Sequence, residues 1–117
     1  MKFWVGITDD EWYEFLSLKH PDELNFWQPT SATSFRAIPA GAPFLFKLHS
    51  PQNYIAGGGF FVRHSILPLA LAWEAFEEKN GAPDFETLLR LIQKHRAKKD
   101  TAINPNLEIG CIILNNP

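Results

Sequence analysis

Hydrophobic and polar positions repeat with two different periods along this chain of 117 residues, and the period predicts the type of element. Residues 2–7 (KFWVGI) are rich in β-branched and aromatic side chains, which predicts a short strand. The sequence TDDE at 8–11 matches a capping box with Thr8 as the cap, and apolar residues then recur at helical spacing. We therefore predict a helix over about 9–19, ended by Pro21.

The middle of the chain predicts a loop and a hairpin. Residues 25–42 hold two prolines and a cluster of Ser, Thr and Gly, so we predict a loop that is long enough to bind a ligand. Segments 43–49 and 54–65, separated by a turn at 50–53, predict a β-hairpin. Glycine weakens a strand, so the triplet at 57–59 requires a bend, a bulge or a close backbone approach.

The last third predicts two helices and a strand. Pro68 begins the first helix and Gly81 ends it, the second helix follows Asp84, and the basic run 93–99 closes it. Residues 107–114 (LEIGCIIL) predict a buried strand. Strands interrupted irregularly by helices predict an α+β domain with a curved sheet, and a small open barrel would account for the glycines.

Composition narrows the classes of function. With 45% hydrophobic and 14% aromatic residues, the chain can bury a core as a single domain over residues 1–117. A net charge of −2 means that any nucleic-acid contact needs a local basic face. The chain shows no signal-peptide pattern and no apolar run near about 18 residues, so we expect a cytoplasmic protein that does not span a membrane. The single cysteine, Cys111, supports neither a disulfide nor a zinc site.

Two clusters are candidate binding residues. Arg63 and His64 are consecutive in a predicted strand and point to opposite faces, so an outward Arg63 could join Lys47 or His49 in a cationic patch beside the glycines. Such a patch would suit a phosphate, and the alternative is a solvated sheet face. Phe26-Trp27 could stack a flipped base, or plug one end of the sheet. The basic run at 94–99 could contact phosphates, or simply complement a helix dipole.

No catalytic constellation is evident. The histidines lack metal-ligand spacing, and neither a nucleophile elbow nor a phosphate-binding loop occurs. The acidic residues at 9–11 would face different directions at a helix start, so capping suffices to explain them. We expect these residues to form no enzyme by themselves and to need no cofactor.

Longer strings carry a resemblance to a known family. NFWQP at 25–29, PFLFKLHSPQN at 43–53, IAGGGFF at 55–61 and LALAWEAFEEKNGA at 69–82 resemble the N-terminal domain of bacterial HNH restriction endonucleases. The resemblance covers roughly residues 2–115 and is to type IV, modification-dependent, EcoWI-like enzymes. It implies a PUA-like (ASCH or EVE type) open β-barrel with inserted helices. The chain holds no HNH motif, so we expect it to be the reader part of a longer nuclease.

The resemblance implies that the domain binds modified double-stranded DNA, most of all phosphorothioate DNA, and targets a C-terminal HNH nuclease for bacterial defence. A phosphorothioate sulfur is large and a poor hydrogen-bond acceptor, so a reader should offer cations or N–H groups to the oxygens and an apolar wall to the sulfur. The residues expected to contact DNA are Phe26, Trp27, Lys47, His49, Gly57, Gly58, Gly59, Phe61, Arg63, His64 and Ser65.

Two alternatives remain open at this point. The domain could read a modified base such as methylated cytosine by base flipping, with the Phe26-Trp27 segment carrying recognition. It could instead be a protein-interaction module whose hairpin edge pairs with a partner. A homodimer of the full-length protein is compatible with the sequence.

Overall fold

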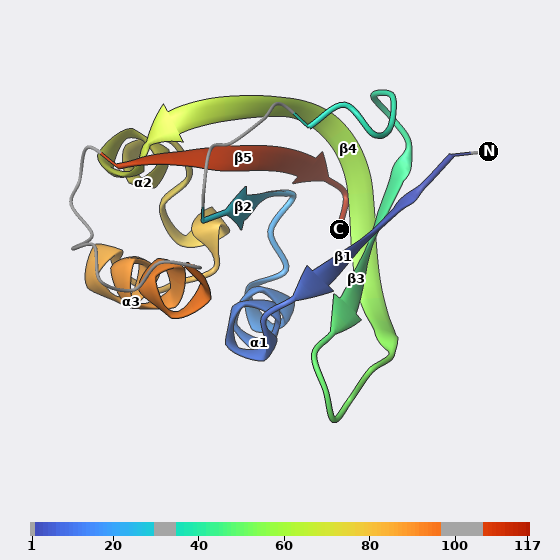
Figure 1. The fold of residues 1–117 in the computed structure, drawn as a ribbon, viewed down its shortest axis with the longest axis horizontal. Helices are drawn as coiled ribbons and strands as arrows, with labels where there is room; N and C mark the ends of the chain where they lie inside the picture. Colours follow the sequence, from blue (N-terminus) through green and yellow to red (C-terminus); the bar gives the residue numbers. More distant parts are fainter. Residues whose placement is uncertain (1, 30–34, 97–106) are drawn as a thin grey trace.

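The computed structural model describes residues 2–29, 35–96 and 107–117 and has an α+β architecture (Figure 1). The strands are β1 (Trp4–Thr8), β2 (Glu23–Gln28), β3 (Pro43–Leu48), β4 (Ile55–Pro68) and β5 (Glu108–Asn115). The helices are α1 (Asp10–Lys19), α2 (Leu69–Phe76), the 3-10 helix η1 (Glu77–Asn80) and α3 (Phe85–His95).

All five strands belong to one mixed sheet in the order β1-β3-β4-β5-β2. The β1 and β3 strands are parallel, and every other neighbouring pair is antiparallel. Among the described residues the sheet is not closed, so β1 and β2 are its two free edges. Figure 1 shows β4 as a long bent strand, with α1 and α3 on the inner side of the bend.

The glycines of β4 allow a close approach of backbones. A Cβ atom at Gly58 would stand 2.6 Å from the carbonyl oxygen of Phe44 on β3, which is closer than real Cβ contacts. A Cβ atom at Gly59 would stand 3.2 Å from the carbonyl oxygen of Asn115 on β5. The first half of β4 pairs with β3 and the second half with β5, so the glycines lie where the strand passes between two partners.

The expected loop over residues 25–42 is wrong in its first part, because β2 occupies Glu23–Gln28. This strand pairs antiparallel with β5, and Leu24 and Trp27 are buried. The prolines, serines and threonines that signalled a loop follow the strand, while its pairing partner lies more than 80 residues away in the sequence. Residues 30–34 of the expected loop lie outside the described residues.

The first helix has a different cap from the expected one. Asp9 is the N-cap of α1, and its Oδ1 accepts a hydrogen bond of 2.9 Å from the main-chain N–H of Trp12. The hydroxyl of Thr8 instead donates to the carbonyl of Gly6, because Thr8 still belongs to β1. Capping by Asp9 buries a carboxylate next to the edge strand β1.

Most other local signals are confirmed, but the helix expected between Pro68 and Gly81 is divided, since α2 ends at Phe76 and Gly81 follows the 3-10 helix η1. The hairpin forms from β3 and β4, α2 begins after Pro68, and the Asp84 side chain caps α3 by accepting from the N–H of Thr87. The α3 helix ends at His95, so the part of the basic run beyond Arg96 lies outside the described residues. Within the described ranges, none of the helices has the length and apolar character needed to cross a membrane.

Replacement of Gly58 by Ala tests the close approach. We expect Gly58→Ala to lower the free energy of unfolding by about 2 kcal/mol, because the added methyl group meets rigid backbone. Gly57→Ala is the matched control, since its Cβ would lie 3.4 Å from the Tyr13 ring, and we expect a loss below about 1 kcal/mol. Urea denaturation of the three proteins measures both values. Equal losses at the two positions would contradict the steric explanation.

Candidate functional site

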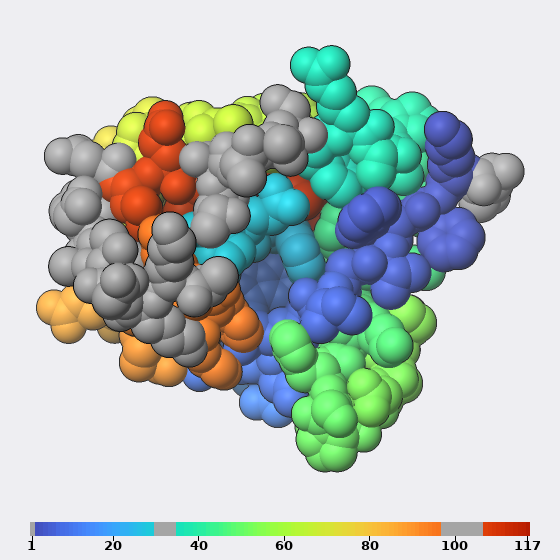
Figure 2. All heavy atoms as spheres, in the orientation of Figure 1, coloured from blue at the N-terminus to red at the C-terminus, as the bar shows by residue number. Residues whose placement is uncertain are grey.

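The two free edges of the sheet face each other across a gap that contains a cavity of about 300 Å³, which we call the seam cavity. Figure 2 shows the hollow near the centre of the face, bordered by β1 in dark blue, β2 in cyan and α3 in orange. Its lining residues are Ile7, Asp9, Trp12, Phe26, Trp27, Gln28, Pro29, His49 and His95. The seam cavity is therefore assembled from both ends of the sheet and from two helices.

Aromatic rings dominate the floor of the seam cavity. Phe26 packs edge-on against Trp12, with ring centroids 5.4 Å apart, and stacks on Phe46 at 5.9 Å. A Cβ atom at Gly6 would stand 2.9 Å from the Phe26 ring, so the glycine in β1 makes room for that ring. Aromatic faces held in this way offer an apolar stacking surface to a flat ligand.

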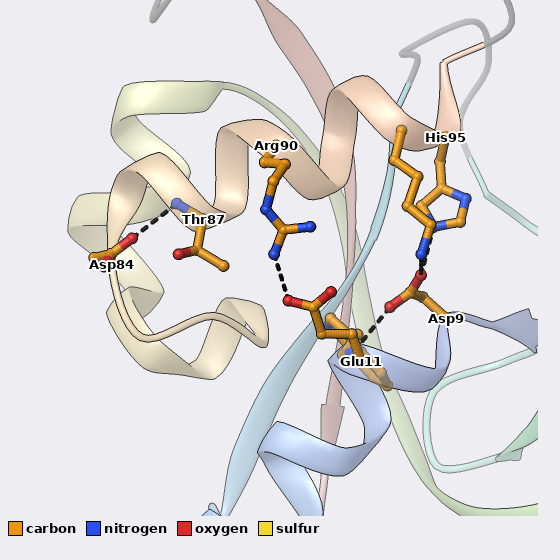
Figure 3. A network of polar contacts seen from close by, with 8 residues as sticks. Asp9, Glu11, Asp84, Thr87, Arg90 and His95 are labelled. Carbon is orange, nitrogen blue, oxygen red and sulfur yellow. Dashed lines mark hydrogen bonds and ion pairs between the residues drawn. The ribbon is translucent and has the colours of Figure 1, made fainter.

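A buried carboxylate joins the two helices beside the seam cavity. Asp9 Oδ2 accepts hydrogen bonds from Lys94 Nζ at 2.9 Å and from His95 Nε2 at 2.7 Å, and the Asp9 side chain is only 7% exposed. Figure 3 shows Asp9 at the start of α1 and His95 at the end of α3 pointing toward each other. A second ion pair, between Glu11 and Arg90, links the same two helices.

The pKa of Asp9 reflects this environment. Burial alone raises the pKa of the Asp9 carboxyl, but the hydrogen bonds from the Trp12 N–H, Lys94 and His95 outweigh burial and lower the pKa from 3.8 to about 2. The carboxylate is thus charged at neutral pH, and its charge is balanced by its own partners. It contributes shape and rigidity to the wall of the seam cavity.

Histidines and cations surround the mouth of the seam cavity. The exposed ring of His49 stacks on the ring of His95, with centroids 5.9 Å apart and an interplanar angle of 19°. Arg96 donates from Nη1 to the carbonyl of Pro29 at 3.2 Å, which ties the end of α3 to the end of β2. The Lys94 side chain remains 52% exposed although it pairs with Asp9. The rim therefore carries basic side chains next to solvent, of which Lys94 is already paired with Asp9.

The structure brings together three of the residues expected to contact DNA. Phe26, Trp27 and His49 all line the seam cavity. Phe26 and Trp27 lie in a strand instead of the expected loop. The indole N–H of Trp27 donates to the carbonyl of Asn80 at 2.8 Å, which fixes that ring against η1.

The expected cationic patch does not come together at one place. Lys47 is half-buried and lies opposite Ile55 at the start of β4, whereas Arg63 is exposed and lies opposite Ile113 on β5. Arg63 is eight residues beyond Ile55, or about 26 Å of extended strand. The glycines between them are buried or half-buried against protein.

The remaining expected residues lie elsewhere on β4. Phe61 is buried and packs edge-on against Phe35, with ring centroids 5.4 Å apart. His64 and Ser65 are half-buried, and burial lowers the pKa of His64. Its Nε2 is buried and has no hydrogen-bond partner within the described part of the chain. None of these three residues lines the seam cavity.

Sequence reasoning missed part of the site. The sequence predicts capping alone for the acidic run at 9–11, yet Asp9 also pairs with two residues of α3 that are about 85 positions away. Ile7 and Gln28 line the seam cavity because β1 and β2 are the two outer strands of the sheet, and the sequence does not predict that order. Among residues 2–29, 35–96 and 107–117, no group of three or more His, Cys, Asp or Glu side chains could hold a metal ion.

The lowered pKa of Asp9 predicts a specific pH dependence. Because the folded-state pKa of about 2 lies below the unfolded value of 3.8, Asp9 stabilises the fold above about pH 4, and this contribution is lost as the pH falls toward 2. We expect the stability difference between wild type and Asp9→Asn to shrink by about 2 kcal/mol between pH 5 and pH 2. Urea denaturation of both proteins at the two pH values measures it.

Asp84→Asn is the matched control, because Asp84 caps α3 without an ion pair in the described structure. Its stability difference from wild type should change less over the same pH interval. A difference for Asp9→Asn that is constant from pH 5 to pH 2 would show that the ion pairs with Lys94 and His95 add nothing.

Comparison with known proteins gives the site no relatives. No protein-family model matches the chain, and neither the curated proteins nor the solved structures yield a match. The geometry of the seam cavity and the sequence resemblance are therefore the two supports for a functional proposal.

Proposed function

We propose that the chain binds modified double-stranded DNA and holds one modified base, extruded from the duplex, in the seam cavity. The observation that carries this proposal is the aromatic floor of a cavity of about 300 Å³ at the open seam of the sheet. A ligand pocket of this volume is at the small end of the usual range and suits a single flat ring.

Stacking is the physical basis of the proposal. An extruded base loses its neighbours in the duplex, and a reader must replace them with aromatic or apolar surfaces. Phe26 supplies such a surface, the buried Trp12 closes the floor nearly at right angles to it, and Ile7 supplies an aliphatic side chain at the mouth. A methyl group on the base would add apolar area to bury, which favours methylated cytosine over the unmodified base.

The rim supports a nucleic-acid ligand. Lys94 and Arg96 stand at the end of α3 next to the mouth, and His49 stacks on His95. Cations so placed can contact the phosphates that flank an extruded nucleotide. Arg96 is the main positive charge of this local face, because Lys94 already pairs with Asp9, and the net charge of −2 does not provide such a face.

The sequence resemblance fits the same proposal. We assign the open curved sheet to the PUA-like type that the resemblance to modification-dependent nucleases implies. In this proposal the domain is a reader, and cleavage belongs to an HNH nuclease domain of a longer cytoplasmic protein. Phosphorothioate recognition is the less favoured alternative, because the glycines, Lys47, Arg63 and Phe61 are spread along the hairpin.

A binding titration with a blocked cavity tests the proposal. Ile7 is 56% exposed, so Ile7→Trp should fill the mouth of the seam cavity without disturbing the core. We expect wild type to prefer a duplex with 5-methylcytosine over an unmodified one, and Ile7→Trp to lose that preference at least tenfold. Val5→Trp is the matched control, because Val5 lies on the same face of β1 outside the lining of the cavity.

A phosphorothioate duplex and two salt concentrations complete the titration. A preference for the sulfur duplex that survives in Ile7→Trp but disappears in Arg63→Ala would overturn base reading in favour of backbone reading. Equal, salt-sensitive binding of wild type to all three duplexes would overturn both, since phosphate contacts alone impose a steep salt dependence.

A further inference from the structure

The position of the seam cavity relative to β2 follows from two adjacent residues. Phe26 and Trp27 are consecutive in a strand, so their side chains leave on opposite faces of the sheet. Both nevertheless line the same cavity. The cavity therefore lies beyond the free edge of β2, where it can be reached from both faces.

The hydrogen bonds of the sheet reveal which residues point toward that edge. The N–H of Asn116 donates to the carbonyl of Asp22 at 3.0 Å, and the next pair along, Glu23 and Asn115, lies directly opposite in the antiparallel register. Bonded and non-bonded pairs alternate along an antiparallel ladder. Leu24, Phe26 and Gln28 thus bond to β5, whereas the main chain of Trp27 points away from it.

The other side of β5 gives an independent check. The N–H of Leu69 donates to the carbonyl of Leu107 at 2.7 Å, next to the opposed pair Pro68 and Glu108. By the same alternation, Cys111 bonds to β4. Cys111 is the residue opposite Trp27, so it leaves the main chain of Trp27 without a partner on β5.

A neighbouring carbonyl shows that this edge accepts hydrogen bonds. Pro29 is two residues after Trp27, so its carbonyl is expected to point to the same side as that of Trp27. This carbonyl accepts a hydrogen bond from Arg96 on the α3 side of the gap. No hydrogen bond from another described element reaches the main-chain N–H or C=O of Trp27. A donor and an acceptor therefore stand side by side at the wall of the seam cavity.

We propose that the main-chain N–H and C=O of Trp27 read the polar edge of the bound base, an inference that rests on the proposed function. In an extended residue the two groups point in the same direction, as they do when two strands exchange a pair of hydrogen bonds. The N–H of Trp27 can donate to an acceptor on the base, and its C=O can accept from a donor next to that acceptor. The ring nitrogen N3 and the 4-amino group of a cytosine form such an edge.

Two different parts of the seam cavity then recognise the base. One face of the ring stacks on Phe26, the ring of Trp12 stands nearly at right angles to Phe26 in the floor, and one edge of the base pairs with the backbone of Trp27. A base that lacks the donor leaves the Trp27 carbonyl desolvated and unpaired, which costs binding free energy. Specificity for the edge then depends on strand geometry, so side-chain substitution at Trp27 should leave it intact.

The test uses two DNA duplexes that differ at one base, 5-methylcytosine or 5-methylpyrimidin-2-one, the analogue without the 4-amino group. We expect the analogue to bind at least tenfold more weakly than 5-methylcytosine, as expected for a lost hydrogen bond in a buried site. In the ¹⁵N-labelled protein, the Trp27 amide proton should move downfield on binding the 5-methylcytosine duplex.

A side-chain variant separates backbone reading from indole reading. Trp27→Phe loses the hydrogen bond to Asn80 but keeps both main-chain groups, so affinity should fall for both duplexes. The ratio of the two affinities should stay within about twofold of the wild-type ratio. A ratio near one in Trp27→Phe would assign the discrimination to the indole and overturn the proposal.

The same titration separates this inference from the proposed function. Preferred binding of the 5-methylcytosine duplex over unmodified DNA, with amide shifts at Ile7 and His95 but none at Trp27 and with equal affinity for the analogue, would overturn the backbone assignment alone. The absence of any preference for the 5-methylcytosine duplex over unmodified DNA would overturn both.

Discussion

The buried carboxylate of Asp9 is the group on which the arrangement of the site depends. A charge removed from water costs several kcal/mol unless it is paired and hydrogen-bonded. Here the α1 backbone, Lys94 and His95 together satisfy it. Because these partners come from the first helix and the last, the carboxylate holds two walls of the seam cavity at a fixed separation. Its engagement also leaves the cavity with aromatic surfaces and no unpaired anion from Asp9, a lining suited to an uncharged flat ligand.

Glycine and aromatic residues act together in this fold. Gly6 makes room for the ring of Phe26, and Gly81, with a φ of 89°, lies directly against the ring of Trp12. Any side chain at either position would displace an aromatic ring of the floor. The high aromatic content is thus matched by bare backbone at the points where rings need space. Gly58 and Gly59 of β4 have a different purpose, since a Cβ atom at either would meet backbone atoms of β3 or β5.

The sequence predicts those parts of the fold whose signals are local. Caps, turn residues and apolar periodicity place α1, α3 and the hairpin, and the α+β class follows from their order. The β2 strand escapes because its stability comes from pairing with β5, far away in sequence, while nearby prolines dominate the local pattern. The residues of the site also fall into those that the sequence predicts and those that it does not. Phe26 and Trp27 stand out as aromatic residues in a polar segment, but the ion pair of Asp9 with α3 depends on tertiary structure that no local spacing encodes.

The continuity of β4 has a thermodynamic consequence. One strand of 14 residues pairs with β3 through its first half and with β5 through its second, so the two halves of the sheet share a single backbone. Neither half can separate without disrupting that strand, which favours unfolding as one cooperative unit. A ligand in the seam cavity touches both free edges of the sheet. Its binding free energy would therefore add to the stability of the whole domain, and occupancy of the cavity would be linked to global unfolding.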